Sequence, residues 1–397
     1  MDPAFHRLRF CPIRGEPTRT ETAMLPSIFL TALKLTDFRN YPQAGLALDG
    51  RHVVLTGENG SGKTNLLEAV SFLSPGRGMR RASYAQVVRK GAPAGFTVFS
   101  ELEGMEGSVA IGTGTDGAEG TGRRVRINGT QAASGDELLD HVRVIWLTPA
   151  MDGLFTGPAG DRRRFLDRMV LSIDPAHGRR VADFERAMRS RNRLLSERRT
   201  EPAWLSGLEE QMAGLGVAMA LARRELLSLL TGLIAESEAG SPFPAPEIAL
   251  AGFFADAADA PAIDLEDRYR AVLEEERFRD AAAGRTLEGP HRSEMAVRHA
   301  QKEMDAALCS TGEQKALLLG LVLAHARLTR RISGHPPVML FDEVAAHLDE
   351  GRRAALFARI AEIGGQAFMT GTDRSLFEAL GDDGQFFTVS DGKIRAD

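Results

Sequence analysis

A glycine-rich stretch near the beginning of the chain has the residues of a phosphate-binding loop. Residues 57–64 read GENGSGKT and match the pattern G-x-x-x-x-G-K-[ST]. In such a loop the backbone N–H groups and the positive end of the following helix hold phosphate oxygens, the lysine reaches the outer phosphates, and the threonine hydroxyl is a Mg²⁺ ligand. A glycine turn without a ligand is the alternative. The pattern favours a nucleoside triphosphate with Mg²⁺, held by Gly57, Glu58, Asn59, Gly60, Ser61, Gly62, Lys63 and Thr64.

An acidic pair follows an apolar segment far along the chain. Residues 338–343 read VMLFDE, which predicts a buried strand that ends in two carboxylates. Ligands of open α/β sheets collect at the carboxyl ends of such strands. We expect Asp342 to hold Mg²⁺ and Glu343 to act as the general base on the attacking water. Because any strand can end in a charged turn, the pair indicates hydrolysis only together with the loop at 57–64.

A third segment, residues 309–319, reads CSTGEQKALLL and begins an apolar helix. Ser310 and Glu313 form the capping pattern S-x-x-E, which completes a helix N-terminus without any nucleotide. The same N-terminus offers N–H groups and a serine hydroxyl at Ser310 and Gly312, which suit a γ-phosphate. Both interpretations can hold together.

Arginines are concentrated between residues 161 and 199, where twelve arginines face six acidic residues. A solvated helix face is one explanation, and contact with nucleic-acid phosphates is the other. Few aromatic residues are interleaved, so contact with a duplex backbone is favoured over base stacking on a single strand. The candidate DNA-binding residues are Arg162, Arg163, Arg164, Arg189, Arg191 and Arg193.

The order of apolar patterns predicts an α/β fold. Alternating residues indicate strands at 28–38 and 52–57, a helical period follows at 65–73, and short strands are expected between 96 and 145. Long amphipathic helices are expected within 161–239, followed by a loop at 240–262. The α/β alternation then resumes with a helix at 313–331, a strand at 337–342, a helix at 351–362 and a strand at 366–370.

We therefore predict one domain built from residues 25–155 and 285–397, with residues 156–284 inserted as a helical arm. Residues 1–24 are read as an extension that is either disordered or lies upstream of a start at Met24. The extension is polar and proline-broken, unlike a signal peptide.

Composition narrows the class of protein. The 397 residues are 43% apolar and carry a formal net charge of −5, so the chain is not basic throughout. Two cysteines, Cys11 and Cys309, offer neither a disulfide framework nor metal-ligand spacing. No apolar stretch approaches the roughly 20 residues of a membrane helix. We expect a cytoplasmic protein without a membrane partner.

The motifs in this order resemble the ATP-binding-cassette ATPases of the SMC-like branch and, within it, the RecF family of bacterial recombination mediators. The segments that carry the resemblance are LTDFRNY, GENGSGKTNLLEAVSFLSPGRGMR, TPAMDGLFTGPAGDRRRFLDRMV, EGPHRSEM and CSTGEQKALLL, and it runs from about residue 28 to the C-terminus.

The resemblance implies an ATP-binding-cassette head domain, a mixed sheet with helices, that carries an inserted helical arm. It implies ATP as cofactor and an ATP-dependent homodimer in which Ser310 and Gly312 contact the partner's nucleotide, with Asp349 in the loop between the two sites. Arg39, which precedes the loop, is expected to reach the nucleotide. Hydrolysis is expected to be slow. The implied partners are double-stranded DNA, gap junctions, and mediators of the RecR and RecO type, in DNA repair, replication, recombination and the SOS response.

Some positions depart from the family pattern. Ser293 and Glu294 stand where an acidic pair is usual, and Ala150 and Met151 leave the metal-sensing loop unassigned. Transporter ATPases have a histidine after the last strand, where the segment FMTGTDRS of this chain offers only Thr370, Gly371 and Thr372, which suits slow turnover.

Three other functions are alternatives to this one. An ATPase subunit of a transporter would have a shorter stretch between its lysine and signature serine, and an SMC-type structural ATPase would have a longer coiled coil. A third alternative is a binding module that never hydrolyses ATP, and only a measurement of turnover distinguishes it from an ATPase.

Overall fold

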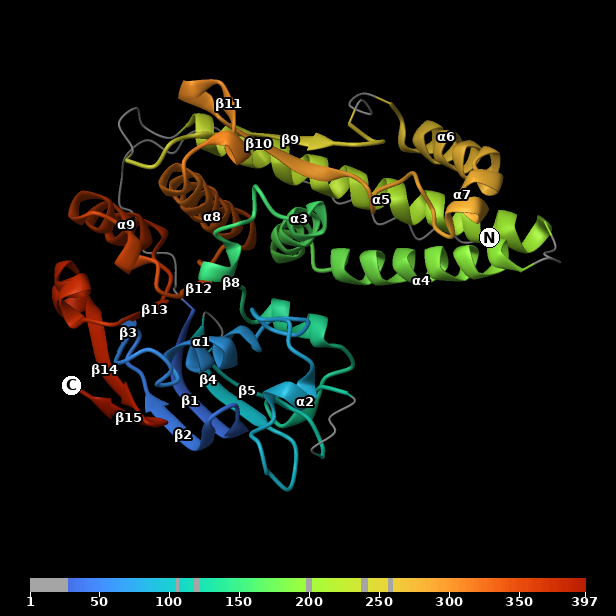
Figure 1. Ribbon diagram of the computed structural model, residues 1–397. Coiled ribbons are helices and arrows are strands. Elements are labelled where there is room, and N and C mark those ends of the chain that lie inside the picture. The colour runs from blue at the N-terminus through green and yellow to red at the C-terminus, as the bar shows by residue number, and fades with distance from the viewer. Residues whose placement is uncertain (1–27, 105–106, 118–121, 198–201, 237–241, 256–259) are drawn as a thin grey trace.

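The computed structural model describes residues 28–397 except 105–106, 118–121, 198–201, 237–241 and 256–259. The predicted extension at 1–24 lies outside the described residues. The described part has an α/β fold, as the sequence predicted, and contains three sheets: a mixed one, an antiparallel one and a small one (Figure 1).

A six-stranded sheet with the order β15-β14-β3-β13-β12-β8 positions the predicted chemistry. Adjacent strands of this sheet run parallel to each other, except that β14 and β15 pair in antiparallel orientation. Its strands are β3 (His52–Thr56), β8 (Val144–Leu147), β12 (Val338–Phe341), β13 (Ala367–Gly371), β14 (Gly384–Ser390) and β15 (Lys393–Ala396). All four residues of β12 are buried, because helices or a second sheet cover both faces.

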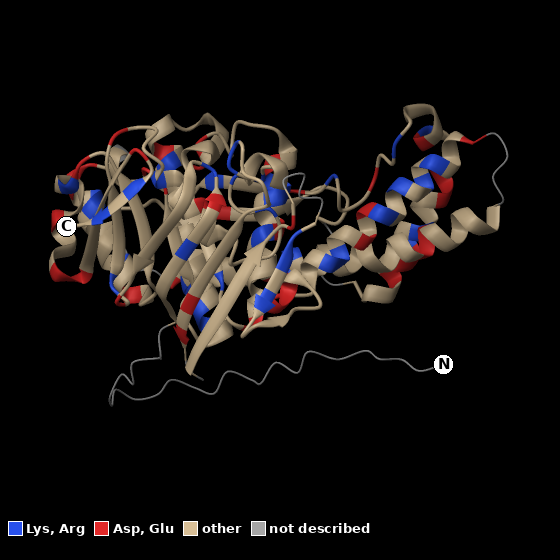
Figure 2. Ribbon diagram, turned by 90° about the horizontal axis from the view of Figure 1, so that it is seen from below, with Lys and Arg blue, Asp and Glu red and all other residues tan. Residues whose placement is uncertain are grey.

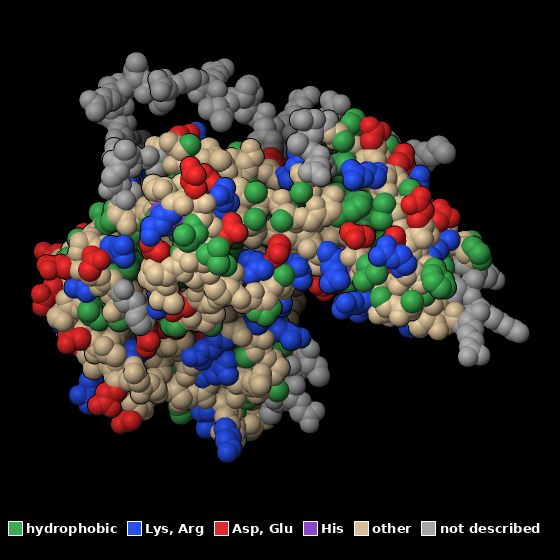
Figure 3. Space-filling model, turned by 45° about the horizontal axis from the view of Figure 1, so that its top comes forward, with side chains coloured by type: hydrophobic (Ala, Val, Ile, Leu, Met, Phe, Trp, Pro, Cys, Tyr) green, Lys and Arg blue, Asp and Glu red, His purple; other side chains and the backbone are tan. Residues whose placement is uncertain are grey.

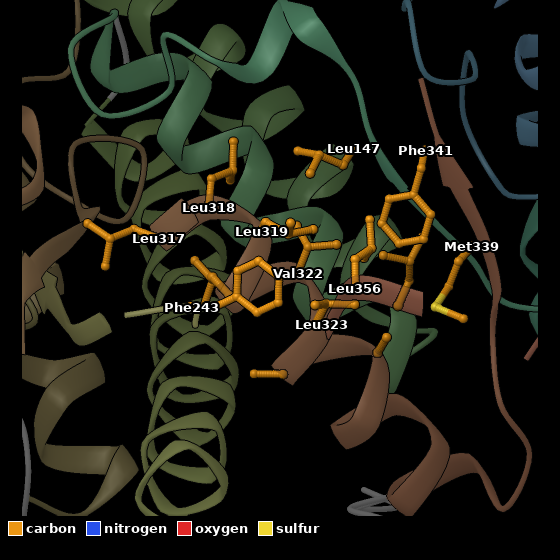
Figure 4. Close-up of a cluster of buried hydrophobic side chains, with 14 of the residues drawn as sticks. Leu147, Phe243, Leu317, Leu318, Leu319, Val322, Leu323, Met339, Phe341 and Leu356 are labelled. Carbon is orange, nitrogen blue, oxygen red and sulfur yellow. The ribbon is translucent and has the colours of Figure 1, made fainter. Parts of the chain in front are cut away.

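The two faces of this sheet belong to two hydrophobic clusters. Val338 and Leu340 of β12 face helix α1 (Lys63–Ser71) and the second sheet, whereas Met339 and Phe341 face helices α8 (Thr311–Ser333) and α9 (Glu350–Ile363). Figure 4 shows the second of these clusters, in which leucines of α8 lie against Leu147 and Phe341. This alternation has the period of two that a strand imposes on its side chains.

The second sheet is antiparallel, with the order β2-β1-β4-β5-β6-β7. Its strands are β1 (Phe29–Phe38), β2 (Tyr41–Ala47), β4 (Thr97–Gly104), β5 (Gly107–Gly114), β6 (Arg124–Ile127) and β7 (Thr130–Gln131). Leu33 and Phe38 of β1 share a buried cluster with Leu66 and Leu67 of α1, so α1 is held between the two sheets. Helix α2 (Tyr84–Val87) lies beyond the loop that follows α1.

The arm is formed chiefly by helices. These are α3 (Ala159–Ile173), α4 (His177–Ser196), α5 (Pro202–Ala235), α6 (Ala262–Glu275) and α7 (Arg277–Ala283). Helices α4 and α5 run side by side away from the sheets (Figure 1). Phe184, Met212 and Tyr269 belong to a third cluster that joins α4, α5 and α6, so the arm has a core of its own.

Seven of the predicted elements are found within a few residues of their predicted ends: β1, β3, α1, α8, β12, α9 and β13. The predicted loop at 240–262 is wrong, because it contains strand β9 (Pro246–Ala251). This strand pairs with β10 (Glu294–His299), which pairs in turn with β11 (Met304–Asp305). The apolar residues of 240–262 suggested no strand because their backbone partner is distant in sequence. The domain boundaries stay a prediction, and the pair β9–β10 joins residues from both sides of the boundary at 284/285.

Short 3-10 helices complete the described chain and connect the larger elements. They are Gly135–Asp140, Pro149–Met151, Ala300–Lys302, Ala306–Leu308, Ala345–His347 and Arg374–Asp383.

Candidate nucleotide site and nucleic-acid interface

The loop at 57–64 connects strand β3 to helix α1 and requires glycine at two positions. Gly57 has φ +141°, and a Cβ atom there would lie 2.1 Å from the carbonyl oxygen of Val389. Gly62 has φ +117°, and a Cβ there would lie 2.5 Å from the hydroxyl of Tyr41. Only glycine fits both the backbone angle and the space, so these residues fix the path of the loop.

The N-terminus of α1 is open. Gly62 provides no side-chain cap, and the first turn contains no acidic residue. The hydroxyl of Ser61 is buried and has no hydrogen-bond partner in the part of the chain that the structure describes. An anion with several oxygens would satisfy this hydroxyl and the positive end of the helix together, so the residues present fit a nucleoside phosphate.

Lys63 lies over the loop. Its ammonium donates hydrogen bonds to the carbonyl oxygens of Gly57 at 2.6 Å and Glu58 at 2.8 Å, and the side chain is buried. Burial lowers the pKa of Lys63, an effect that the carboxylates of Glu343 and Asp342 oppose. The lysine therefore stabilises the loop in the absence of an anion, and its charge is placed where phosphates would bind.

Thr64 and Asp342 meet although they are 278 positions apart in sequence: the Thr64 hydroxyl donates to Asp342 Oδ1 at 2.9 Å. The Thr370 hydroxyl donates to the same oxygen at 2.9 Å. Burial raises the pKa of Asp342, while these two donors act in the opposite direction. One carboxylate beside one hydroxyl fits Mg²⁺, which takes few protein ligands and completes its shell with phosphate oxygens and water.

Glu343 follows Asp342 in a strained conformation. Its φ is +55°, a left-handed value that is uncommon for a residue other than glycine. Its backbone N–H donates to the Thr370 hydroxyl at 2.8 Å. Its carboxylate has no hydrogen bond or ion pair with any described residue and lines a groove beside Thr64 and Asp342. This arrangement leaves the carboxylate available to accept a proton from water.

Thr370 is the site residue that sequence reasoning missed. In the sequence it is notable only because no histidine follows the last predicted strand. It lies at the end of β13, which pairs in parallel with β12 in the register Phe341 to Met369. One hydroxyl thereby positions both members of the acidic pair. A polar residue at the carboxyl end of the neighbouring strand was the available signal.

Arg39 is ion-paired with helix α1 and is not a free cation beside the loop at 57–64. Its guanidinium forms a two-pronged ion pair with buried Glu68 of α1 at 2.8 and 2.6 Å and donates to the carbonyl of Gln86. Arg39 therefore anchors α1, and its predicted contact with nucleotide stays a prediction.

Ser310 and Gly312 lie exposed at the N-terminus of α8, and neither lines the groove that contains Thr64. The capping box is present: the Ser310 hydroxyl accepts from the N–H of Glu313 and donates to its carboxylate at 2.9 Å. Glu313 also pairs with Lys302, and these contacts, the lysine first, lower the pKa of Glu313 to about 2.

The candidate DNA contacts divide into two groups. Arg191 is wrong as a DNA contact, because its guanidinium is fully buried and pairs with Glu209 at 2.9 Å and Asp280 at 2.6 Å. Arg162 is not available either, since Glu294 and three backbone carbonyls surround its guanidinium. The amino-acid sequence does not distinguish a buried arginine from an exposed one.

The remaining four, Arg163, Arg164, Arg189 and Arg193, keep at least part of their surface exposed. Figure 2 shows that basic and acidic residues are interleaved along the arm, as expected for a solvated face. Arg164 pairs with Asp161, and Arg189 lies 3.5 Å from Glu185. Their contact with DNA stays a prediction.

Known proteins resemble this chain over nearly its full length. The family model of the RecF/RecN/SMC N-terminal domain matches residues 29–394. DNA replication and repair protein RecF of Rhizobium rhizogenes is 67% identical over 368 residues, which are 92% of this chain and 98% of the relative. RecF of Agrobacterium fabrum is 63% identical and aligns over 94% of this chain and its own full length. The chain belongs to the RecF family.

Solved structures confirm the fold of this RecF-family chain. The recombination mediator protein RecF with ATP, in the RecFOR pathway, has a TM-score of 0.85 at 23% identity and covers 95% of this chain and 100% of its own. An SMC head domain from Pyrococcus furiosus has a TM-score of 0.53 at 17% identity, covering 93% and 96%. RecF-family proteins are DNA replication and repair proteins and ATP-binding SMC-like ATPases, and the transporter alternative is not favoured. In the described chain no helix is long and apolar enough to cross a bilayer.

Proposed function

We propose that this RecF-family chain is a cytoplasmic, ATP-dependent DNA-binding recombination mediator that dimerises on ATP and hydrolyses it slowly. The observation that carries the proposal is the meeting of Thr64, Asp342 and Thr370 beside an uncapped helix N-terminus. A solved structure of RecF with ATP has the same fold, which supports ATP as the ligand.

The chain's own groups divide the work. The N–H groups of residues 57–64 and the Lys63 ammonium hold the β- and γ-phosphates, and Thr64 and Asp342 hold Mg²⁺, which supplies neutralisation of charge on the phosphates. Glu343 accepts a proton from the attacking water. Thr370 holds the Asp342 carboxylate and the backbone N–H of Glu343 in place.

The second half of the site comes from another copy. Ser310 and Gly312 are exposed and lie apart from Thr64, so a nucleotide on one copy is completed by α8 of the other, with Asp349 between the sites. Opening of such a dimer after hydrolysis would release DNA. Partners of the RecR and RecO type, gapped duplex DNA and a role in the SOS response follow from the RecF family and from the RecFOR pathway of the related structure.

The test is the mass of the protein in solution by light scattering, with and without ATP, Mg²⁺ and a gapped duplex. We expect the mass to double only with nucleotide and the duplex to be retained by the doubled species. A protein that stays monomeric with ATP and still retains the duplex would overturn the dimer switch. Turnover measured with and without the duplex tests the slow, DNA-linked hydrolysis.

A further inference from the structure

A large groove continues from the nucleotide site along helix α3. It has a volume of about 1470 Å³ and is lined at one end by Thr64, Asp342 and Glu343 and further along by the loop 74–81 and by α3 and α4. Pockets for small molecules measure about 300–1000 Å³, so the groove is larger than one nucleotide requires. Figure 3 shows Lys and Arg side chains gathered on both sides of the hollow between the arm and the rest of the molecule.

The walls of this groove have an excess of positive charge. Eight arginines line it, and three of them have acidic partners, which are Glu68 for Arg80, Asp161 for Arg164 and Asp167 for Arg223. Within the described residues, the other five have no carboxylate partner: Arg77, Arg81, Arg163, Arg168 and Arg292. Apart from the catalytic pair, the acidic residues of the lining are Asp161, Asp167 and Glu185, and each is already ion-paired.

The arginines lie close enough to repel each other. Burial lowers the pKa of Arg168 to about 9, and the charge of Arg81 adds to the effect. After burial, Arg164 and Arg77 lower the pKa of Arg81, whereas Asp161 and Glu185 raise it. For the pKa of Arg163, Glu294 opposes the effect of burial, and Arg223 and Arg292 add to it. Arginine side chains stay protonated in proteins at neutral pH. A chain of net charge −5 thus holds a local cluster of cations whose repulsion an anion would relieve.

The aromatic rings of the groove do not offer a surface for bases. Trp146, Phe165 and Phe184 are buried, and the guanidinium of Arg168 covers Trp146 at 4.3 Å from the ring centre. Recognition of single strands uses exposed rings on which bases stack, whereas recognition of a duplex backbone uses cations and hydrogen-bond donors and requires no exposed ring. The length of the groove and its unpaired cations fit a row of phosphates.

We propose that the groove between the loop 74–81 and helix α3 binds the phosphate backbone of duplex DNA, with Arg77, Arg81, Arg163 and Arg292 as its cations. The inference rests on the proposed DNA-binding function and replaces the exposed face of α4 as the place of contact. The groove also gives a route to the nucleotide site. Arg80 of the same loop donates to Asn65 and Glu68 of α1, so a duplex that fixes the loop also fixes the helix that holds the phosphates.

The test compares two double variants that lose the same charge. Arg77→Ala/Arg81→Ala removes two groove cations, and Arg186→Ala/Arg193→Ala removes two exposed cations of α4 that do not line the groove. Binding of a short fluorescein-labelled duplex to the full chain with ATP is measured by anisotropy over a range of salt concentrations. Thermal unfolding shows that each variant is folded, and Arg77→Lys/Arg81→Lys retains the charge.

We expect the groove double variant to bind the duplex about a hundredfold more weakly and to reduce the slope of log K against log salt by about 2, one unit for each lost phosphate contact. The α4 double variant should change both quantities much less, and the lysine variant should recover most of the affinity. Tripolyphosphate at the same phosphate concentration should compete poorly, because it spans only part of the groove.

Four outcomes would overturn the inference. Equal losses in the two alanine variants, or an unchanged groove variant beside a wild type that binds DNA, would remove the groove as the contact surface and leave the proposed function standing. Loss of ATP-dependent mass doubling in the groove variant, with duplex binding intact, would make the groove an interface between copies. A wild type that binds no duplex with any nucleotide would refute the DNA function itself.

Discussion

Two helix N-termini of this chain are candidates for contact with the same γ-phosphate, and they differ in how the chain treats them. Helix α1 begins at Lys63 without a side-chain cap and without an acidic residue in its first turn. Helix α8 begins at Thr311 with a complete capping box, and its acidic residue Glu313 is further held by Lys302. The N–H groups at the start of α1 receive no side-chain cap from the chain, whereas those at the start of α8 are capped by Ser310.

The difference indicates the order of events. An anion at α1 gains N–H donors that have no competing side chain. An anion at α8 must compete with the Glu313 carboxylate for the Ser310 hydroxyl. Nucleotide is therefore expected to bind first at α1 and only then, with a second copy, at α8.

The largest effect is expected at α1. Lys63→Ala should weaken ATP binding by at least about a hundredfold, because it removes charge-assisted hydrogen bonds to phosphate. The matched control is Lys302→Ala, which removes a lysine at the other N-terminus and should leave ATP binding to the single chain unchanged. Binding of a fluorescent ATP analogue measures both. An equal loss of ATP affinity in the two variants would contradict the assignment of α1, rather than α8, as the ATP-binding N-terminus of the single chain.

Glu343→Gln should lower the rate of ATP hydrolysis by about 10²–10⁴-fold, since an amide cannot accept the proton of water. ATP binding should be retained, and the ATP-bound dimer should accumulate. Glu378→Gln, on an exposed 3-10 turn, is the control for loss of one negative charge. Turnover measured by phosphate release decides the matter, and an unchanged rate would remove Glu343 from the role of base.

Thr370→Val should reduce ATP turnover by about tenfold, because Thr370 positions Asp342 and Glu343 and does not itself contact ATP. The change removes a donor to Asp342 and the acceptor for the Glu343 N–H, each worth about 1–3 kcal/mol when left unsatisfied. With one donor gone, the pKa of Asp342 rises further, so the acid limb of the pH–rate profile should move to higher pH. Thr370→Ser should restore both the rate and the profile, whereas a loss without a shift would indicate a packing role alone.

The smallest effect is expected at the α8 capping box. The folded pKa of Glu313, about 2, is below its ordinary value of 4.5, so its pairing stabilises the fold fully above pH 4.5 and is lost as pH falls toward 2. Glu313→Gln keeps a capping side chain and loses the ion pair with Lys302. The difference in free energy of unfolding between wild type and variant should be constant at neutral pH and shrink on acidification. A difference that grows in acid would contradict this sign.

Sequence was most informative where the chemistry is local. The phosphate loop is a run of eight residues, and its glycine positions follow from backbone angles that only glycine adopts readily. The capping box of α8 is likewise contained within four residues and was predicted together with its alternative. Buried strands such as β12 were predicted because a parallel strand covered on both faces is apolar throughout.

Sequence was least informative where the partner of a residue is distant. Arg191 looked like its neighbours on α4, and only the packing of α4 against α5 and α7 places Glu209 and Asp280 around it. Strand β9 depends on β10, more than forty residues later, for its hydrogen bonds. Five arginines without an ion pair line one groove because the loop after α1 faces α3. No sequence pattern predicts that these two segments lie together.

The sequence by itself determined the glycine-rich loop, the acidic pair, the capped N-terminus of α8 and the family resemblance. Each of these depends on contiguous residues whose backbone and side-chain chemistry is short-range. The tertiary structure alone decided that Thr370 joins Asp342 to Glu343, that Arg39 holds Glu68, and which arginines remain available to an anion. The physical reason is that the pairing and desolvation of a charge depend on every group around it in space, and most of those groups come from elsewhere in the chain.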